Sequence, residues 1–316
     1  MCRLFGFRSV IPSQVHRSLV VADNALGVQS DRHPDGWGVA YYVDGAPHVT
    51  RSPRTALGDQ LFHRVSGVVA SETVLAHVRK ATQGSLSVLN CHPFQHGRWV
   101  MAHNGDVPDF ARHRATMLAE VAPRLRRYVL GDTDSEVIFY VFLTYLQQHG
   151  PLGSRLGLDA VVPALRQTVR FVRGLQAESL LTLLVTDGTT MAAVQGGKEL
   201  HWSTYKNRCG DRDSCPSLSP ECEAPTKTGF VNHWIVSSEP LQGENVWVPL
   251  EPGEILGVDW QMRVQRAHVD RVNLEVVRHG GRARCARSHV DRDPRGRAAV
   301  VERAMGARTK RHERIL

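Results

Sequence analysis

Long apolar runs are missing from this sequence of 316 residues: no stretch of 18 or more apolar residues occurs. The start, Met1-Cys-Arg-Leu-Phe-Gly-Phe-Arg, has neither an extended apolar segment nor a small-residue cleavage site. A membrane-spanning helix needs about 20 mainly apolar residues, and a secretory signal peptide needs an apolar core before its cleavage site. The sequence therefore predicts a soluble, cytoplasmic protein without a membrane partner.

Aromatic residues are also few, at 7%, and only six cysteines are scattered along the chain. A chain of this length can bury a sufficient core without disulfides, and in a reducing compartment such cysteines remain thiols. Cys209, Cys215 and Cys222 are spaced by six and seven residues, whereas structural zinc sites use closely paired cysteines. We expect these three in a solvated loop, and we expect no metal and no cofactor.

An excess of positive charge is absent from most of the chain, although the net charge is +8. Residues 278–316 carry 12 Lys/Arg and 4 Asp/Glu, which leaves 27 basic and 27 acidic residues before them. We predict one domain over residues 2–277, with a mobile loop at about 206–229, followed by a basic, disordered tail over 278–316. Because the tail lacks interleaved aromatic residues, a solubilising role is favoured over nucleic-acid binding.

The periodicity of apolar residues predicts an α+β fold. Strands are expected over 2–9, 36–43, 48–51, 73–79 and 98–104, and again in six short segments after residue 178. Helices are expected over 13–28, 55–65, 109–121, 135–149 and 159–175. So many strands outside a strict β-α repeat favour a four-layer αββα sandwich, with two stacked antiparallel sheets flanked by helices, over a doubly wound sheet.

Cys2 becomes the first residue if Met1 is removed, an event that a small second residue favours. The α-amine of such a residue has a pKa of about 7.7–8.0, so it can accept the thiol proton near neutral pH. One residue then supplies both a nucleophile and its base. A cysteine at position two of an arbitrary protein is usually accidental, so other segments must support this interpretation.

Two segments at predicted strand ends could bind a substrate. Residues 77–84 read His-Val-Arg-Lys-Ala-Thr-Gln-Gly, in which Arg79 can hold a carboxylate with two hydrogen bonds and Thr82 can add a third. Residues 103–105 read His-Asn-Gly, so the Asn104 amide and the Gly105 N–H can face a developing oxyanion. Taken alone, Arg79 fits a surface or ion-pair arginine, and Asn-Gly fits an ordinary turn.

A third segment, Gly-Asp-Thr-Asp-Ser-Glu at residues 131–136, precedes an apolar helix. Asp134 can bind an ammonium group or cap the helix, and Asp132 competes for either role. Ser135 is the other candidate for the cap.

Together these segments resemble, in content and order, the glutaminase domain of class II glutamine amidotransferases, which are N-terminal-nucleophile (Ntn) hydrolases. The resemblance covers about residues 2–260, is closest to the stand-alone bacterial YafJ-like group, and extends to His33-Pro-Asp-Gly-Trp-Gly38 and Cys91-His-Pro-Phe94. It implies the Ntn-hydrolase fold. It also implies that Cys2 attacks the amide, Asn104 and Gly105 form the oxyanion hole, Arg79 and Thr82 bind the α-carboxylate, and Asp134 binds the α-ammonium.

Some positions are less specific or depart from the family pattern. Asp35, Gly36 and Trp37 are candidate pocket residues, although Trp37 can instead pack beneath the Asp35-Gly36 turn. Members coupled to an acceptor commonly have Trp and His where this chain has Lys80 and Gln83, so no ammonia channel is inferred.

Three hypotheses follow from these observations. The first is a γ-glutamyl amide hydrolase acting on L-glutamine or a γ-glutamyl conjugate, with a separate synthase as the possible ammonia acceptor. The second is a catalytically idle relative that binds glutamine. The third, a nucleic-acid accessory protein, is disfavoured by the neutral body of the chain.

Overall fold

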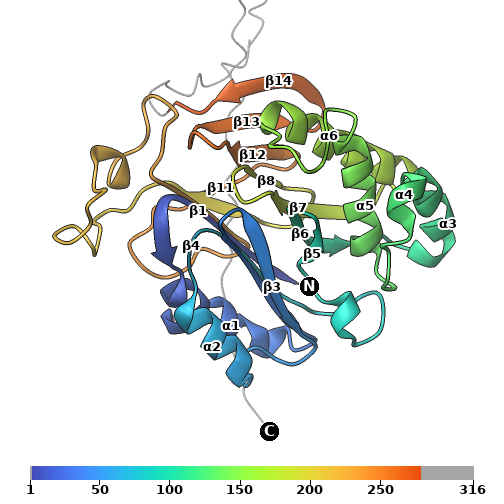
Figure 1. Cartoon of the computed structure of the whole chain (residues 1–316), viewed down its shortest axis with the longest axis horizontal. Coiled ribbons are helices and arrows are strands. Elements are labelled where there is room, and N and C mark those ends of the chain that lie inside the picture. Colours follow the sequence, from blue (N-terminus) through green and yellow to red (C-terminus); the bar gives the residue numbers. More distant parts are fainter. Residues whose placement is uncertain (1, 279–316) are drawn as a thin grey trace, which may run out of the picture. The chain divides into compact units, whose positions relative to one another are not determined.

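The computed structural model describes residues 2–278, so the predicted basic tail lies outside the described residues except for Arg278. Within them, the strands form two antiparallel sheets that face each other (Figure 1). The first sheet has the order β11 (Val248–Pro249), β9 (His201–Ser203), β10 (His233–Ser237), β1 (Arg3–Gln14), β4 (Ala70–Val78), β2 (Trp37–Val43) and β3 (Ala46–Ser52).

The second sheet has the order β14 (Arg271–Val276), β13 (Val264–His268), β12 (Glu254–Val258), β8 (Met191–Val194), β7 (Leu180–Thr186), β6 (Trp99–Asp106) and β5 (Phe94–His96). Alternation of side chains along each strand gives every sheet an inner and an outer face. Leu4 and Leu75 of the first sheet share one buried cluster with Val100 and Ala102 of the second. This cluster fills the space between the sheets.

Helices cover both outer faces, as Figure 1 shows. The second sheet packs against α3 (Phe110–Glu120), α4 (Pro123–Arg126), α5 (Asp134–Leu146) and α6 (Leu158–Leu175). The first sheet packs against α1 (Leu26–Gln29), α2 (Gln60–Val68) and the π turn η1 (Arg17–Val21). Short 3-10 turns are η2 (Ser30–Arg32), η3 (Val88–Asn90) and η4 (Pro220–Cys222). The αββα sandwich predicted from the sequence is confirmed.

The helix predicted over residues 13–28 is wrong. Ser13 and Gln14 instead continue β1 and pair with β4, and only η1 and α1 are helical in this segment. Between η1 and α1, the Asn24 side chain donates to the Pro240 carbonyl at 2.8 Å and accepts from the Gln242 N–H at 2.8 Å. Val15, Leu19 and Leu26 still face the core, which explains the helical spacing of the apolar residues.

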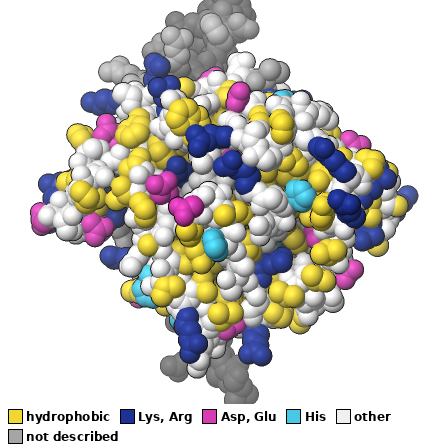
Figure 2. Space-filling view, viewed as in Figure 1, with side chains coloured by type: hydrophobic (Ala, Val, Ile, Leu, Met, Phe, Trp, Pro, Cys, Tyr) yellow, Lys and Arg dark blue, Asp and Glu magenta, His cyan; other side chains and the backbone are white. Residues whose placement is uncertain are grey.

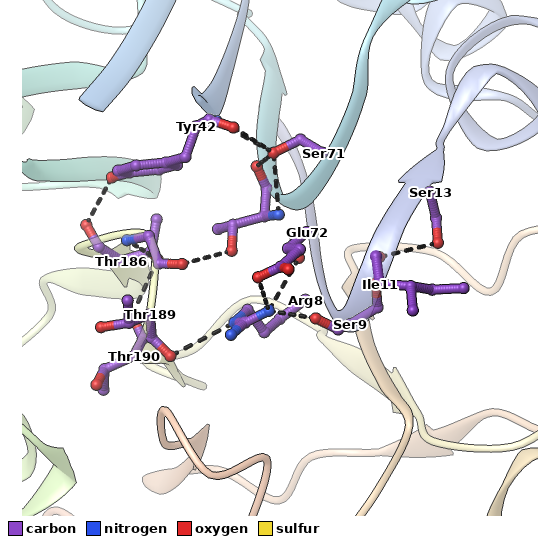
Figure 3. A network of polar contacts seen from close by, with 12 residues as sticks. Arg8, Ser9, Ile11, Ser13, Tyr42, Ser71, Glu72, Thr186, Thr189 and Thr190 are labelled. Atoms are coloured by element: carbon purple, nitrogen blue, oxygen red, sulfur yellow. Dashed lines mark hydrogen bonds and ion pairs between the residues drawn. The ribbon is translucent and has the colours of Figure 1, made fainter. Parts of the chain in front are cut away.

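One end of the sandwich is closed by polar contacts between the sheets (Figure 3). The Tyr42 hydroxyl donates to the carbonyl of Thr186 at 3.2 Å, and the Thr73 hydroxyl donates to the carbonyl of Gly188 at 2.7 Å. Arg8 reaches the Thr189 carbonyl from β1 at 3.4 Å. These contacts fix the β7–β8 turn against the first sheet, at the end of β4 remote from Arg79.

At the opposite end of the sandwich, Gly38 allows the backbone of His92 to lie close to β2. It lies on the inner face of β2, and a Cβ added there would overlap the carbonyl oxygen of His92. We expect Gly38→Ala to lower the free energy of unfolding by about 2 kcal/mol or more, because a backbone atom must move. Gly67→Ala, in α2 with open space around it, is the matched control and should be neutral or slightly stabilising. Urea unfolding of both variants measures the difference, and equal stabilities would contradict the expectation.

No helix within residues 2–278 combines the length and the apolar content that crossing a membrane requires. On the face drawn in Figure 2, basic and acidic side chains are interspersed with apolar ones.

Candidate active site

Strand alternation brings three of the predicted site residues to one end of the space between the sheets. Leu4 and Leu75 face inward, so Cys2 at the start of β1 and Arg79 just after β4 also face inward. Arg3 pairs with Val78, which makes Cys2 and Arg79 adjacent on neighbouring strands. In β6, Val100 and Ala102 face inward and Asn104 therefore does so as well.

Cys2 is 8% exposed, and its Sγ lies 3.4 Å from the Lys80 backbone N–H nitrogen. Burial raises the pKa of the Cys2 thiol, while the Lys80 N–H and the Arg79 charge act in the opposite direction. The thiol is therefore protonated at neutral pH and needs a base before it can act as a nucleophile. The charge of Asp134 also acts on the thiol, which brings a fourth predicted residue to the same site.

Arg79 is buried and organises the loop that follows it. Its guanidinium donates to the carbonyls of Gln83 at 2.8 Å, Gly84 at 3.4 Å and Ser85 at 3.2 Å. Thr82, in the same loop, is exposed. The loop is tied to the second sheet, because the Gln83 side-chain amide donates to an Asp106 carboxylate oxygen at 3.2 Å.

Asn104 and Gly105 lie near the end of β6. Asn104 is 2% exposed, and its Oδ1 is buried without a hydrogen-bond partner among the described residues. A Cβ on Gly105 would overlap the Leu180 carbonyl and the His103 ring, so only glycine fits there. His103 faces the opposite way, with Nε2 2.8 Å from the Leu180 carbonyl oxygen and Nδ1 2.9 Å from the Ser135 hydroxyl.

Asp134 is buried at the start of α5, whereas Asp132 is exposed. The expectation that Asp134 or Ser135 caps this helix is wrong: Thr133 is the N-cap, and its hydroxyl accepts from the Glu136 N–H. Asp134 instead accepts from the Val107 and Ser135 N–H groups at 2.9 and 2.7 Å. Burial raises the pKa of Asp134, against the effects of the His103 ring and the Val107 N–H.

The Asp35-Gly36-Trp37 segment pairs with the end of β4. The Asp35 carboxylate accepts from the Ala81 N–H at 2.8 Å, and the Gly36 carbonyl accepts from the Arg79 N–H at 2.7 Å. The side chain of Trp37 lies in the outer core, where its Nε1–H donates to Asp59 at 3.0 Å and its ring meets Phe62. The sequence left two alternatives for Trp37, a place in the pocket or packing beneath the Asp35-Gly36 turn. The structure shows a packed side chain.

The sequence did not predict the Gln83–Asp106 hydrogen bond or the contact between the Ser135 hydroxyl and the His103 ring. It also left unexplained a pair of buried histidines, His77 and His92, whose rings are in contact and tilted relative to each other. The Thr133-x-x-Glu136 spacing is a capping-box pattern that could have assigned the cap to Thr133.

A cavity of about 980 Å³ lies beside the second half of β1, and none of the predicted site residues lines it. It is lined by parts of segments 7–23, 206–222 and 232–245, including Cys209, Cys215 and Cys222. The expectation of a solvated loop is wrong for Cys209 and Cys222, which are buried because the loop folds back onto β10 and the segment beside it.

Known proteins are similar to this chain over most of the residues that the structure describes. The family model for glutamine amidotransferases of class II matches residues 1–273. The putative glutamine amidotransferase YafJ of Escherichia coli is 26% identical over 80% of this chain and 96% of its own length. A probable glutamine amidotransferase of Saccharomyces cerevisiae, DUG3, is 29% identical over 60% of this chain, and the match spans only 62% of the yeast protein.

A γ-glutamyl-hercynylcysteine sulfoxide hydrolase of Mycobacterium tuberculosis is 39% identical over 119 residues, which are 34% of this chain and 50% of that protein. The solved structure of a class II glutamine aminotransferase domain protein from Silicibacter pomeroyi shares the fold, with a TM-score of 0.56 and 22% identity over 84% of this chain and 99% of that one. With the family model matched across nearly all the described residues, the chain belongs to the class II glutamine amidotransferases and is similar to the YafJ-like members.

Proposed function

We propose that the chain, once Met1 is removed, hydrolyses the side-chain amide of L-glutamine or of a γ-glutamyl compound through Cys2. One observation carries this proposal. Cys2 and Arg79 are adjacent on neighbouring strands, the charge of Asp134 acts on the Cys2 thiol, and Asn104 faces the same space from β6. Their chemistry matches the parts of a glutamine molecule: a cation for the α-carboxylate, an anion for the α-ammonium, and a nucleophile with an amide donor for the reacting carbonyl.

The proposed reaction has two steps. The free α-amine of Cys2 accepts the thiol proton, and the sulfur adds to the γ-carbonyl to give a tetrahedral oxyanion that Asn104 Nδ2 and the Gly105 N–H stabilise. The C–N bond breaks, the amine returns the proton to the leaving nitrogen, and ammonia or an amine departs. Water then attacks the γ-glutamyl thioester, passes a proton back to Cys2 and releases glutamate. The raised thiol pKa is consistent with the need for an internal base.

The recognition of the glutamyl part is proposed as follows. Arg79 holds the α-carboxylate, helped by Thr82, and Asp134 holds the α-ammonium. The Asp35-Gly36 segment supports Arg79 through backbone pairing and forms the wall of the pocket. Trp37 supports that wall from the outer core.

A γ-glutamyl conjugate is the second candidate substrate. It is favoured by the 39% identity to the mycobacterial hydrolase, which is higher than the identity to the putative amidotransferases but covers a third of the chain. In that case the product is an amine and no acceptor is needed. If glutamine is the substrate, a separate synthase is the expected ammonia acceptor.

The deciding experiment measures glutamate released from L-glutamine and from a panel of γ-glutamyl amides by protein whose mature mass lacks Met1. Turnover of glutamine supports the amidotransferase-type reaction, and preference for a conjugate supports the second candidate. Binding of glutamine without release of glutamate from any tested compound would support the hypothesis of a catalytically idle relative.

Asp134 gives the reaction an expected pH dependence. Its pKa is raised by burial, so it becomes protonated at a higher pH than an ordinary aspartate and then no longer attracts an ammonium group. We therefore expect KM for glutamine to rise as pH falls through that raised pKa, while Asp134→Asn has a KM already raised by about 10- to 100-fold, as for the loss of a charged hydrogen bond. Steady-state kinetics from neutral to mildly acidic pH test both points. A KM that is the same in the variant and the wild type would exclude this role for Asp134.

A further inference from the structure

The Asn90 side chain joins the two segments that carry the proposed binding residues for the α-carboxylate and the α-ammonium. Asn90 is 1% exposed and ends the short turn η3. Its Nδ2 donates to the Ser85 carbonyl at 3.0 Å and to the Ser85 hydroxyl at 3.2 Å. Its Oδ1 accepts from the Asp132 N–H at 2.9 Å. One carboxamide therefore connects the loop after β4 with the segment that leads into α5.

Each end of this bridge lies next to a proposed binding residue. The Ser85 carbonyl also accepts from the Arg79 guanidinium at 3.2 Å, so Asn90 and Arg79 share one acceptor oxygen. Asp132 lies directly before the N-cap of α5 and two residues before Asp134. The bridge therefore touches the loop that holds the cation and the backbone that leads to the anion.

Two glycines make room for the Asn90 carboxamide. A Cβ added to Gly131 would overlap Asn90 Oδ1. A Cβ added to Gly84 would lie 2.9 Å from Asn90 Nδ2 and 3.0 Å from Thr133 Cγ2. The loop after β4 thus packs on the cap of α5 with the carboxamide between them. Its orientation is fixed by its partners, because a carbonyl accepts and a backbone N–H donates.

The two proposed binding charges belong to different layers of the fold. Arg79 follows β4 of the first sheet, whereas Asp134 begins α5, which packs on the second sheet. An α-amino acid carries its carboxylate and its ammonium on one carbon, so the two partners must be held at a fixed separation. A buried, paired carboxamide such as that of Asn90 is a rigid link, because separating its partners leaves polar groups unpaired. The Gln83–Asp106 hydrogen bond keeps the loop attached without it.

We propose that Asn90 is a positioning residue, which holds Arg79 and Asp134 at the spacing of the two charged groups on the α-carbon of a γ-glutamyl ligand. Holding both partners in place before binding reduces the ordering that binding requires. The bridge therefore favours ligands with both charged groups over ligands with a carboxylate alone. This inference rests on the proposed function and deepens it, because it names a residue that sets specificity for the amino-acid end of the substrate.

Calorimetry on the full chain without Met1 tests this role with two probes. L-glutamate, the product of either candidate substrate, has both charged groups, and glutarate lacks the ammonium. We expect Asn90→Ala to raise the Kd of L-glutamate by about 10-fold and the Kd of glutarate by no more than about threefold. Asn24→Ala is the matched control, because the Asn24 carboxamide also joins two segments through one donor and one acceptor bond. It should leave both Kd values within about twofold.

Gly131→Ala disturbs the same contact while Asn90 is retained, because the added Cβ displaces Asn90 Oδ1. It should reproduce the effect on L-glutamate, and it is the second variant if the unfolding temperature shows that Asn90→Ala does not fold. With the preferred γ-glutamyl amide, both variants should raise KM and keep kcat within about threefold.

Three results would overturn the proposal: an unchanged Kd of L-glutamate in a folded variant, an equal loss for both probes, or an equal loss in Asn24→Ala. A fall in kcat with unchanged KM would also contradict it. A wild-type chain that neither binds L-glutamate nor hydrolyses any γ-glutamyl amide would refute the proposed function instead.

Discussion

Replacement of Cys2 by alanine is expected to reduce glutamate release to the background level, with the unfolding temperature within a few degrees of the wild type. The thiol is the atom that forms the acyl-enzyme, so no other group in the site replaces it. Only one sulfur is lost from a residue that precedes β1, and the β1–β4 and β1–β10 ladders stay intact. Turnover is measured by coupled glutamate detection and the fold by circular dichroism.

Cys222→Ala is the matched control for this variant. Cys222 is buried to the same extent as Cys2, at 8% exposure, and it accepts a hydrogen bond from Asn232 Nδ2 at 3.0 Å in the remote cavity. Its replacement should leave turnover unchanged. Comparable activity of Cys2→Ala and wild type would exclude the thioester mechanism.

The second large effect is expected from Asn104→Ala. Removal of one oxyanion donor typically lowers kcat by about 10²–10³, which corresponds to about 2.7–4 kcal/mol of transition-state stabilisation. KM should change little, because the donor acts mainly on charge that develops after binding. Steady-state kinetics with glutamine give both constants.

Asn232→Ala is the control here, since Asn232 is also a buried asparagine with side-chain hydrogen bonds but lies beside the remote cavity. It should lower the unfolding temperature without lowering kcat. A rise in KM with unchanged kcat in Asn104→Ala would assign this side chain to ground-state binding and remove it from the oxyanion hole.

Much of the fold could be predicted from the sequence, because most strands are short apolar runs that are buried on both faces and the long helices are rich in buried apolar residues. β7 (Leu180–Thr186) and β10 (His233–Ser237) lie in the region after residue 178 where short strands were expected. The failure at residues 13–28 has a tertiary cause: pairing of Ser13 and Gln14 with β4 overrides a helical pattern. β13 and β14 were missed because exposed charged residues weaken their patterns.

The segment His103-Asn-Gly could be assigned to the candidate site only through the family resemblance, because Asn-Gly alone fits an ordinary turn, whereas the structure places Asn104 and Gly105 in β6. The choice between Asp132 and Asp134 required the helix start, since the Thr133 cap turns Asp134 into the interior and leaves Asp132 in solvent. The Gln83–Asp106 contact depends on how the two sheets stack, and no local pattern encodes that relation.

The position of Cys2 immediately before β1 has a practical consequence for producing the protein. An affinity tag placed before it would continue the strand directly beside Arg79 and would convert the proposed base into an amide nitrogen. Recombinant material should therefore carry its tag after residue 316 and be checked by intact mass before any assay. Inactivity of a protein tagged at the other end would say nothing about its chemistry.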